Sequence, residues 1–177
     1  MKSISEESIF LLQNWSIVEK LQASIKHLEK EIVHKVNHIG EEIKDKDWWN
    51  SKIIFTEFKH GFYFAKKKWN KYIQIGIEHF QPESLIGSSD HKSWCYLWIK
   101  GPEKDNINSS LENILKKDEY FNEYYISRSS YLLKKVFRKH TEENYEDFMN
   151  DDFLNEYVEF LEKVYLKIQS FEIPSNS

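Results

Sequence analysis

Apolar residues recur every three or four positions along the first 44 residues of the chain. Eight of them follow one another at spacings of 3-4-3-4-4-3-4: Val18, Leu21, Ile25, Leu28, Ile32, Val36, Ile39 and Ile43. This spacing places all eight on one stripe of an α-helix, close to the seam of a coiled coil. We call this stripe the seam. Residues 1–44 are therefore predicted to form one long helix, begun by Ser5 as a cap or by Ser3 and Glu6 as a capping box.

The predicted helix is longer than the rest of the chain can cover. A helix of about 35 residues is roughly 52 Å long, whereas a compact domain of 177 residues is only about 40 Å across. Part of the seam should therefore project from the domain or lie along another molecule. We expect Ile25, Leu28 and Ile32 to bind a protein partner, which is either a different protein or a second copy of this chain.

After residue 44 the apolar pattern changes to alternation, which is typical of β-strands. Four strands are predicted, at residues 52–58, 62–66, 72–80 and 93–100. The first three are separated by short polar links typical of hairpins, and residues 81–92 form a longer irregular connection before the fourth. Residues 120–127 are a candidate fifth strand. The sheet is thus predicted to be four- or five-stranded and mostly antiparallel.

Helical patterns return after Gly101 and Pro102. A short helix follows Asn108, and residues 131–140 read as a strongly amphipathic helix. A last helix is expected from Thr141 to about residue 171, with Asp151 or Asp152 as an alternative cap. The predicted class is α+β, with a long N-terminal helix over 1–44 and an α+β domain over 45–177. In that domain the sheet occupies 52–100 and the helical part 106–171.

The composition limits the class of protein and the cellular compartment that we expect. Aromatic residues make up 16% of the chain, a content typical of a folded protein, and the net charge is −4. Cys95 is the single cysteine, so one chain offers neither a disulfide nor a thiolate zinc site, and a reducing, cytoplasmic location is expected. No signal peptide and no membrane span are predicted, because no stretch approaches 18 apolar residues.

One set of residues has the form of a nuclease site. Asp47 precedes Glu57 and Lys59 with a spacing that resembles Asp, spacer, Glu-x-Lys. In metal-dependent nucleases two carboxylates hold a divalent cation and the lysine polarises the attacking water. Such a site requires Glu57 and Lys59 to project from the same strand face, and it would bind Mg²⁺. No cofactor is expected outside this alternative.

Basic residues suggest a third type of site, for nucleic acid. Lys134, Lys135, Arg138 and Lys139 lie on one side of the predicted amphipathic helix, and Trp69 or Tyr72 could offer a stacking platform beside further lysines. A stripe of possible metal ligands on the long helix lies opposite the seam and is interpreted as a solvated face, so no metal site is assigned to it: His27, Glu31, His34, His38 and Glu41.

Residues 48–99 resemble part of a known superfamily. The aromatic segments Gly61-Phe62-Tyr63-Phe64, Ile75-Gly76-Ile77-Glu78 and Leu97-Trp98-Ile99 look like the downstream, non-catalytic region of bacterial PD-(D/E)XK nuclease proteins. The resemblance covers about half of the chain. It implies an α+β recognition module, and it argues against the nuclease site, because Glu57 and Lys59 fall where that superfamily has no catalytic residues.

The leading hypothesis is a non-catalytic binding protein that acts through protein–protein contacts. The resemblance suggests a phage, mobile-element or defence-associated protein that binds a host nuclease or a nucleoprotein complex. The alternatives are a divergent Mg²⁺-dependent nuclease and a protein that binds RNA or DNA directly.

Overall fold

The computed structural model describes residues 5–69, 71–81, 84, 93–126, 130–136 and 150–173. Its helices are α1 (Glu6–Gln13), α2 (Trp15–Lys44), α4 (Lys104–Leu115), the short 3₁₀ helix η1 (Glu119–Tyr124) and α5 (Asp151–Ile168). Its strands are β1 (Ile53–Phe58), β2 (Gly61–Lys66), β3 (Ile73–Glu78), β4 (Trp94–Ile99) and β5 (Tyr131–Val136). The predicted α+β class is confirmed.

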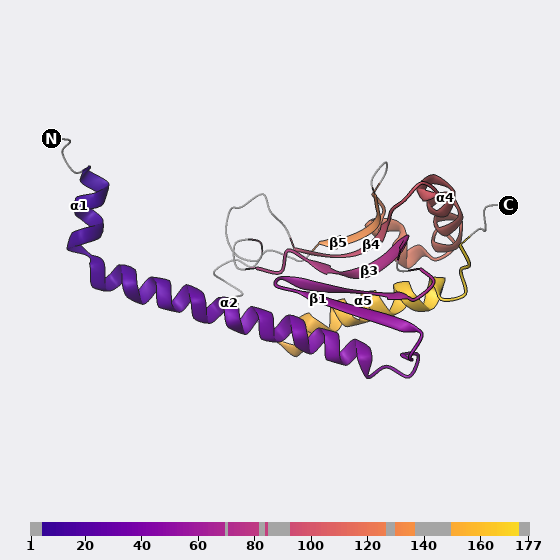
Figure 1. Cartoon of the computed structure of the whole chain (residues 1–177), viewed down its shortest axis with the longest axis horizontal. Coiled ribbons are helices and arrows are strands. Elements are labelled where there is room, and N and C mark those ends of the chain that lie inside the picture. The colour runs from indigo at the N-terminus through magenta and orange to yellow at the C-terminus, as the bar shows by residue number, and fades with distance from the viewer. Residues whose placement is uncertain are drawn as a thin grey trace.

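The five strands form one antiparallel sheet in the order β1-β2-β3-β4-β5. Each strand therefore pairs with its neighbour in the chain, as the short hairpin links predicted for the first three. The four strands predicted between residues 52 and 100 are all present, with bounds that differ by one or two residues. Helices α2 and α5 pack against one another and on the same side of the sheet, and the long α2 continues beyond it (Figure 1).

The helix predicted for residues 131–140 is wrong over residues 131–136, the part that the structure describes. Tyr131–Val136 is strand β5, in which Leu133 pairs with Leu97 of β4. The candidate fifth strand at 120–127 is largely the 3₁₀ helix η1. The helical part predicted for 106–171 therefore contains a strand of the sheet. The expected helix start at Thr141 lies outside the described residues, and α5 begins at Asp151.

Two neighbouring leucines explain why β5 resembled a helix. Leu132 and Leu133 are both buried, although successive residues of a regular strand point to opposite faces. The pairing of β4 with β5 is irregular at this point, and Leu132 is the additional residue. An irregularity of this kind produces a pair of adjacent apolar residues, which is also typical of an amphipathic helix.

The core lies between the sheet and the helices α2 and α5. Ile39 and Ile43 of α2, Phe64 of β2 and Tyr165 of α5 are at most 2% exposed. Trp48 extends this core, because its ring stacks on Tyr165 with 4.3 Å between the centroids. Its indole Nε1 also donates a hydrogen bond of 2.8 Å to the Glu162 carboxylate. The turn after α2 is thereby attached to α5.

The seam of α2 divides into two halves. Ile32, Val36, Ile39 and Ile43 are at most 3% exposed and belong to the core. We define the body of the molecule as all described residues after Leu28. Farther toward the N-terminus the same stripe extends beyond this body. Figure 1 shows this half of α2 extending away from the sheet with α1 at its end. The expectation that part of the seam lies beyond the domain is therefore met.

The predicted N-terminal helix is interrupted once. Ser5 caps α1 as predicted, since its hydroxyl accepts a hydrogen bond of 3.2 Å from the Ser8 amide. At Asn14 the helix breaks, and the Asn14 side-chain amide donates 2.9 Å to the Phe10 carbonyl. Asparagine satisfies backbone groups locally in this way and is therefore common at helix ends. As a result α1 leaves the line of α2 at an angle (Figure 1).

Gly40 sets how closely α2 approaches the sheet. It is buried, and a Cβ atom at this position would lie 2.9 Å from the ring carbon Cζ of Phe55 in β1. Real Cβ atoms essentially never approach another heavy atom so closely. The ammonium group of Lys44 lies 4.1 Å from the centre of the same ring. Phe55 thus contacts α2 at two successive turns of the helix.

The two halves of the seam should respond differently to truncation. Ile39→Ala is expected to lower the free energy of unfolding by about 2–5 kcal/mol, because it leaves a cavity in the core. Ile25→Ala removes a side chain that the body does not contact, so the expected change is within about 0.5 kcal/mol. Urea unfolding of both variants in dilute solution tests this. Equal losses would show that Ile25 also packs within its own chain.

Candidate protein-binding arm

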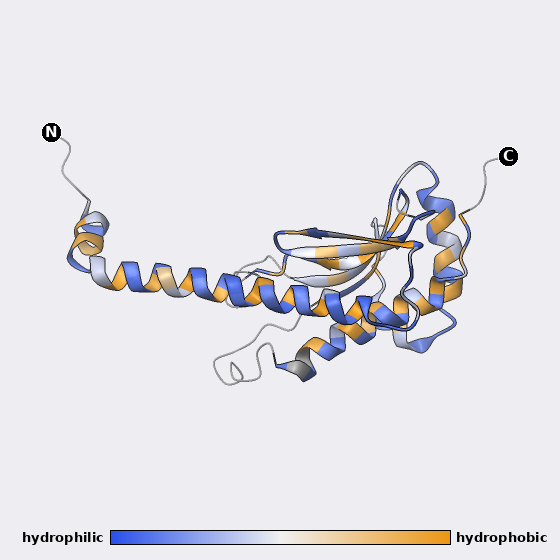
Figure 2. Ribbon diagram, turned by 60° about the horizontal axis from the view of Figure 1, so that its bottom comes forward, coloured by the Kyte–Doolittle hydropathy of each residue, from blue (hydrophilic) through white to orange (hydrophobic). Residues whose placement is uncertain are grey.

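The N-terminal arm, defined as residues 5–28, carries the largest exposed apolar side chains of the described chain. Eight of them are between 43 and 64% exposed: Ile9, Phe10, Leu11, Leu12, Trp15, Ile17, Leu21 and Ile25. Figure 2 shows these hydrophobic positions on α1 and the first half of α2, with no other described element beside them. Isolated exposed leucines are ordinary in proteins, but eight exposed large apolar side chains within one short segment are typical of an interaction region.

The predicted partner-binding residues lie on both sides of the boundary between arm and body. Ile25 is exposed, Leu28 is partly buried against the core, and Ile32 is 1% exposed. Ile32 is therefore a core residue and not part of the exposed arm. The sequence could not place the boundary, because the seam has the same composition on both sides.

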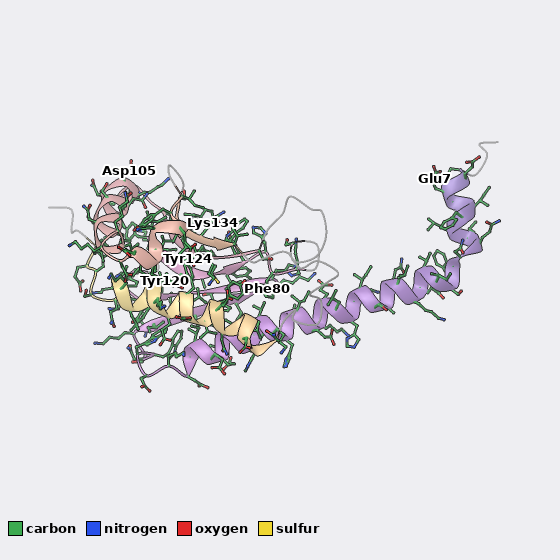
Figure 3. The ribbon with its side chains drawn as sticks, turned by 180° about the vertical axis from the view of Figure 1, so that it is seen from behind. Glu7, Phe80, Asp105, Tyr120, Tyr124 and Lys134 are labelled. Atoms are coloured by element: carbon green, nitrogen blue, oxygen red, sulfur yellow. The ribbon has the colours of Figure 1, made fainter. Side chains whose placement is uncertain are left out.

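The tip of the arm is acidic. Glu6 and Glu7 occupy the first turn of α1, where helix N-termini favour negative charge. Hydrogen bonds from the backbone amide and from Ser5 lower the pKa of Glu7, so this carboxylate is charged at neutral pH. Glu7 lies at the far end of the molecule from the sheet (Figure 3). A partner of this region should accordingly offer basic groups next to apolar ones.

An open hollow of about 550 Å³ lies alongside α2, where the arm joins the body. The described residues that line it are His27, Leu28, Lys30, Glu31, Ile32, His34 and Lys35. Among these described lining residues, Lys30 and Lys35 are basic and Glu31 is acidic. Sequence reasoning did not find this hollow, because it had assigned the histidines only to a solvated face.

The residues of the nuclease alternative do not form the expected arrangement. Lys59 follows the end of β1 and lies in the turn to β2, so it does not share a strand face with Glu57. Its ammonium group is 2.8 Å from the Glu29 carboxylate, and it lowers the pKa of that group. Glu57 lies 3.5 Å from Lys44 instead. Asp47 is exposed in the turn that precedes β1, whereas Glu57 stands near the other end of this strand.

The predicted basic face is also divided. Lys134 and Lys135 are successive residues of a strand and point to opposite faces of the sheet. Lys135 lies 3.5 Å from Glu156 of α5 on the core side. Arg138 and Lys139 fall outside the described residues. Trp69 is fully buried and donates a hydrogen bond of 2.9 Å to the Phe171 carbonyl, so it is not a stacking platform.

Lys134 instead belongs to an aromatic cluster on the outer face of the sheet. Its ammonium group lies 3.4 Å from the ring centre of Trp94 and 4.0 Å from that of Tyr131. The Glu78 carboxylate accepts hydrogen bonds from the Trp94 indole at 2.6 Å and from the Tyr131 hydroxyl at 2.5 Å. Partial burial lowers the pKa of Lys134. We call Glu78, Trp94, Tyr131 and Lys134 the outer-face cluster, which the alternation of aromatics in β4 could have indicated.

Two histidines of the α2 stripe lie near carboxylates one helical turn away. The pairs are His27 with Glu31 at 3.8 Å and His38 with Glu42 at 3.9 Å, and all four side chains are exposed. Among the described residues no three histidine, cysteine, aspartate or glutamate side chains are arranged to hold a metal ion. In the same part of the chain no helix has the length and apolar character needed to cross a lipid bilayer.

Comparison with known proteins gives no relative from which a function could be transferred. No protein-family model matches the chain, and no curated protein or solved structure is significantly similar to it. The resemblance to PD-(D/E)XK proteins is therefore untested.

The separation of Asp47, Glu57 and Lys59 leads to a first biochemical expectation. Purified protein with Mg²⁺ or Mn²⁺ should cleave neither DNA nor RNA, because two carboxylates must share one cation for this chemistry. Incubation with single- and double-stranded substrates tests this. Cleavage that Glu57→Ala and Lys59→Ala both abolish would restore the nuclease alternative.

Proposed function

We propose that this chain is a non-catalytic binding protein whose N-terminal arm forms an intermolecular helical contact with another protein chain. The observation that carries this proposal is the continuity of the seam, which is fully buried from Ile32 onward and uncovered at Leu21 and Ile25. Both halves have the same spacing and the same residue types. A surface built like the buried half is expected to be buried as well.

Helix stability supports the same proposal. Helices shorter than about 12–15 residues are marginal in water without tertiary packing. α1 has eight residues, and none of them is buried. It is joined to the start of α2 through its C-cap, Asn14. The interactions that keep α1 folded should therefore come from another molecule. Burying each large apolar side chain of the arm would contribute about 1.5–3 kcal/mol.

The resemblance to PD-(D/E)XK proteins suggests which kinds of partner to consider. It favours a nuclease or a nucleoprotein complex as the final target of the body. The arm itself offers an apolar helical stripe and an acidic tip, which suit another helix more than a nucleic acid.

A photo-crosslinking amino acid at position 21 tests the proposal in the native host at native expression level. We expect covalent adducts with protein, because Leu21 lies on the seam. The same amino acid at position 23, on the opposite side of α2, should give few adducts. Absence of protein adducts at position 21 would refute the proposed contact, and the mass of an adduct distinguishes a second copy from a different protein.

Charge substitutions provide a matched control. Leu21→Asp with Ile25→Asp should abolish the intermolecular contact, while Ser16→Asp with Ala23→Asp adds the same charge to the opposite side of α2 and should preserve it. Thermal unfolding of the body should be unchanged in both. Unfolding of the Leu21/Ile25 variant alone would show that the seam is intramolecular.

The outer-face cluster favours a second function, the binding of single-stranded nucleic acid. Trp94, Trp98 and Tyr131 are partly exposed on this face, and aromatic rings beside lysines are typical of stacking platforms. Lys100 contributes a further positive charge, 4.8 Å from the Trp98 ring centre. The Glu78 carboxylate opposes binding, which is why we rank this function second.

This second function predicts binding that weakens steeply with salt. Lys134→Gln should reduce the slope of log affinity against log salt by about 0.7, the value of one phosphate contact on a single strand. Fluorescence anisotropy with a labelled oligonucleotide measures the slope, with Lys117→Gln as an exposed control away from the face. No binding at low salt would exclude this function.

A further inference from the structure

The geometry points to a second copy of this chain as the occupant of the arm. We infer that two arms pair antiparallel over Val18–Leu28, and that α1 of each copy lies in the hollow beside α2 of the other. This inference rests on the proposed function and specifies its partner. It follows from four observations on the seam, the body, the helix break and the hollow.

The residue types of the seam suit a pair of helices. Val18, Ile25 and Ile32 alternate with Leu21 and Leu28 at spacings of three and four residues. β-branched residues at one seam position and leucine at the other favour two-stranded coiled coils over larger assemblies. This preference was established for parallel coiled coils, so it does not decide between a parallel and an antiparallel pair. The orientation of the two helices follows from the rest of the molecule.

The body excludes the parallel orientation. Paired helices approach to about 8–10 Å between their axes. In a parallel pair the second α2 would continue along the first through residues 32–43. On that side the first α2 is already covered by its own α5 and sheet, which bury Ile32, Val36, Ile39 and Ile43. Only an antiparallel pair places the two bodies at opposite ends, where neither overlaps the other.

The break at Asn14 agrees with one antiparallel register. If Val18 lies opposite Leu28 of the second copy, Leu21 lies opposite its Ile25, and each seam layer combines a leucine with a β-branched residue. One layer farther on, Asn14 would meet Ile32, the first fully buried residue of the other body. The straight helix ends at Asn14, so α1 turns aside where the second body begins.

The hollow offers a complementary surface to the displaced α1. Its lining includes Ile32, which Asn14 of the second copy would face in this register. Lys30 and Lys35 line it, and α1 brings Glu6 and Glu7 together with exposed apolar residues such as Phe10. Basic and apolar groups on one side thus match acidic and apolar groups on the other. Pairing of the two seams alone would not require basic side chains at this place.

Single cysteines can determine both the partner and the orientation. Cys95 is fully buried and burial raises its thiol pKa, so it should not compete in disulfide exchange. Val18→Cys and Leu28→Cys proteins, one of them carrying a mass tag, are mixed and oxidised. We expect a mixed disulfide dimer between the two proteins and little dimer from either protein alone.

Geometry explains this asymmetry. In the antiparallel register position 18 of one copy lies beside position 28 of the other, but two residues 18 are ten helical residues apart, roughly 15 Å at 1.5 Å per residue. Disulfides require Cα atoms within about 7 Å. An in-register parallel pair would instead give dimers from each protein alone. Ala23→Cys, on the opposite side of α2, is the control and should give no dimer.

Light scattering of the purified protein gives an independent readout. A dimer mass that Leu21→Asp with Ile25→Asp reduces to a monomer mass supports the inference. Dimers from Val18→Cys alone would overturn the antiparallel arrangement. A monomeric protein without mixed disulfides would overturn the second copy as partner, whereas the proposed function would survive if position 21 still forms adducts with a different protein in the native host.

Discussion

The apolar stripe of the continuous helix α2 lies in two different surroundings, the core of the body and the uncovered arm. The stripe on α2 runs through 30 residues of helix, but the sheet and α5 cover it only from Ile32 to Ile43. Because an α-helix repeats its side-chain directions every few residues, the uncovered half points to the same side as the covered one. The position of the body on that side therefore limits what can lie along the arm. Length, orientation and choice of partner all depend on this constraint.

The sheet applies a second simple rule, the alternation of side chains between its two faces. In β4 it sends Cys95, Leu97 and Ile99 into the core and Trp94, Tyr96 and Trp98 to the outer face. Two lysines that are neighbours in sequence consequently end in unlike surroundings. One lies among the rings of the outer-face cluster, and the other lies near Glu156 of α5. Positive charge that looks concentrated in the sequence is dispersed in the fold.

Local patterns were sufficient to predict most of the fold. The seam predicted a long N-terminal helix, and alternation with short links predicted β1 to β4, because hairpin partners are neighbours in the chain. β5 could not be assigned in this way, since its pairing with β4 joins residues more than 30 positions apart and its irregular residue Leu132 imitates helical spacing. Long-range pairing of this kind leaves no reliable local signal.

The candidate site was predictable only in part. Exposed apolar length on the helix followed from size alone, which correctly placed Ile25 in the uncovered half of the seam. The limit of the core between Leu28 and Ile32 did not follow, because it depends on how far the sheet and the N-terminal end of α5 extend along α2. Nor did the break at Asn14, whose side-chain hydrogen bond to Phe10 interrupts a pattern that otherwise continues. The hollow beside α2 required the three-dimensional arrangement.

Gly40 lies in the part of α2 where the direction of the helix is fixed. The helix rests on Phe55 at this glycine, where an added methyl group would be too close. The turns from Ile32 to Ile43 are packed in the core, and about 25 residues of helix separate Gly40 from Trp15, roughly 38 Å at 1.5 Å per residue. A change in this packing that tilts α2 by a few degrees would therefore move the far end of the helix by several ångströms. A glycine in the core thus contributes to where the tip of the molecule points.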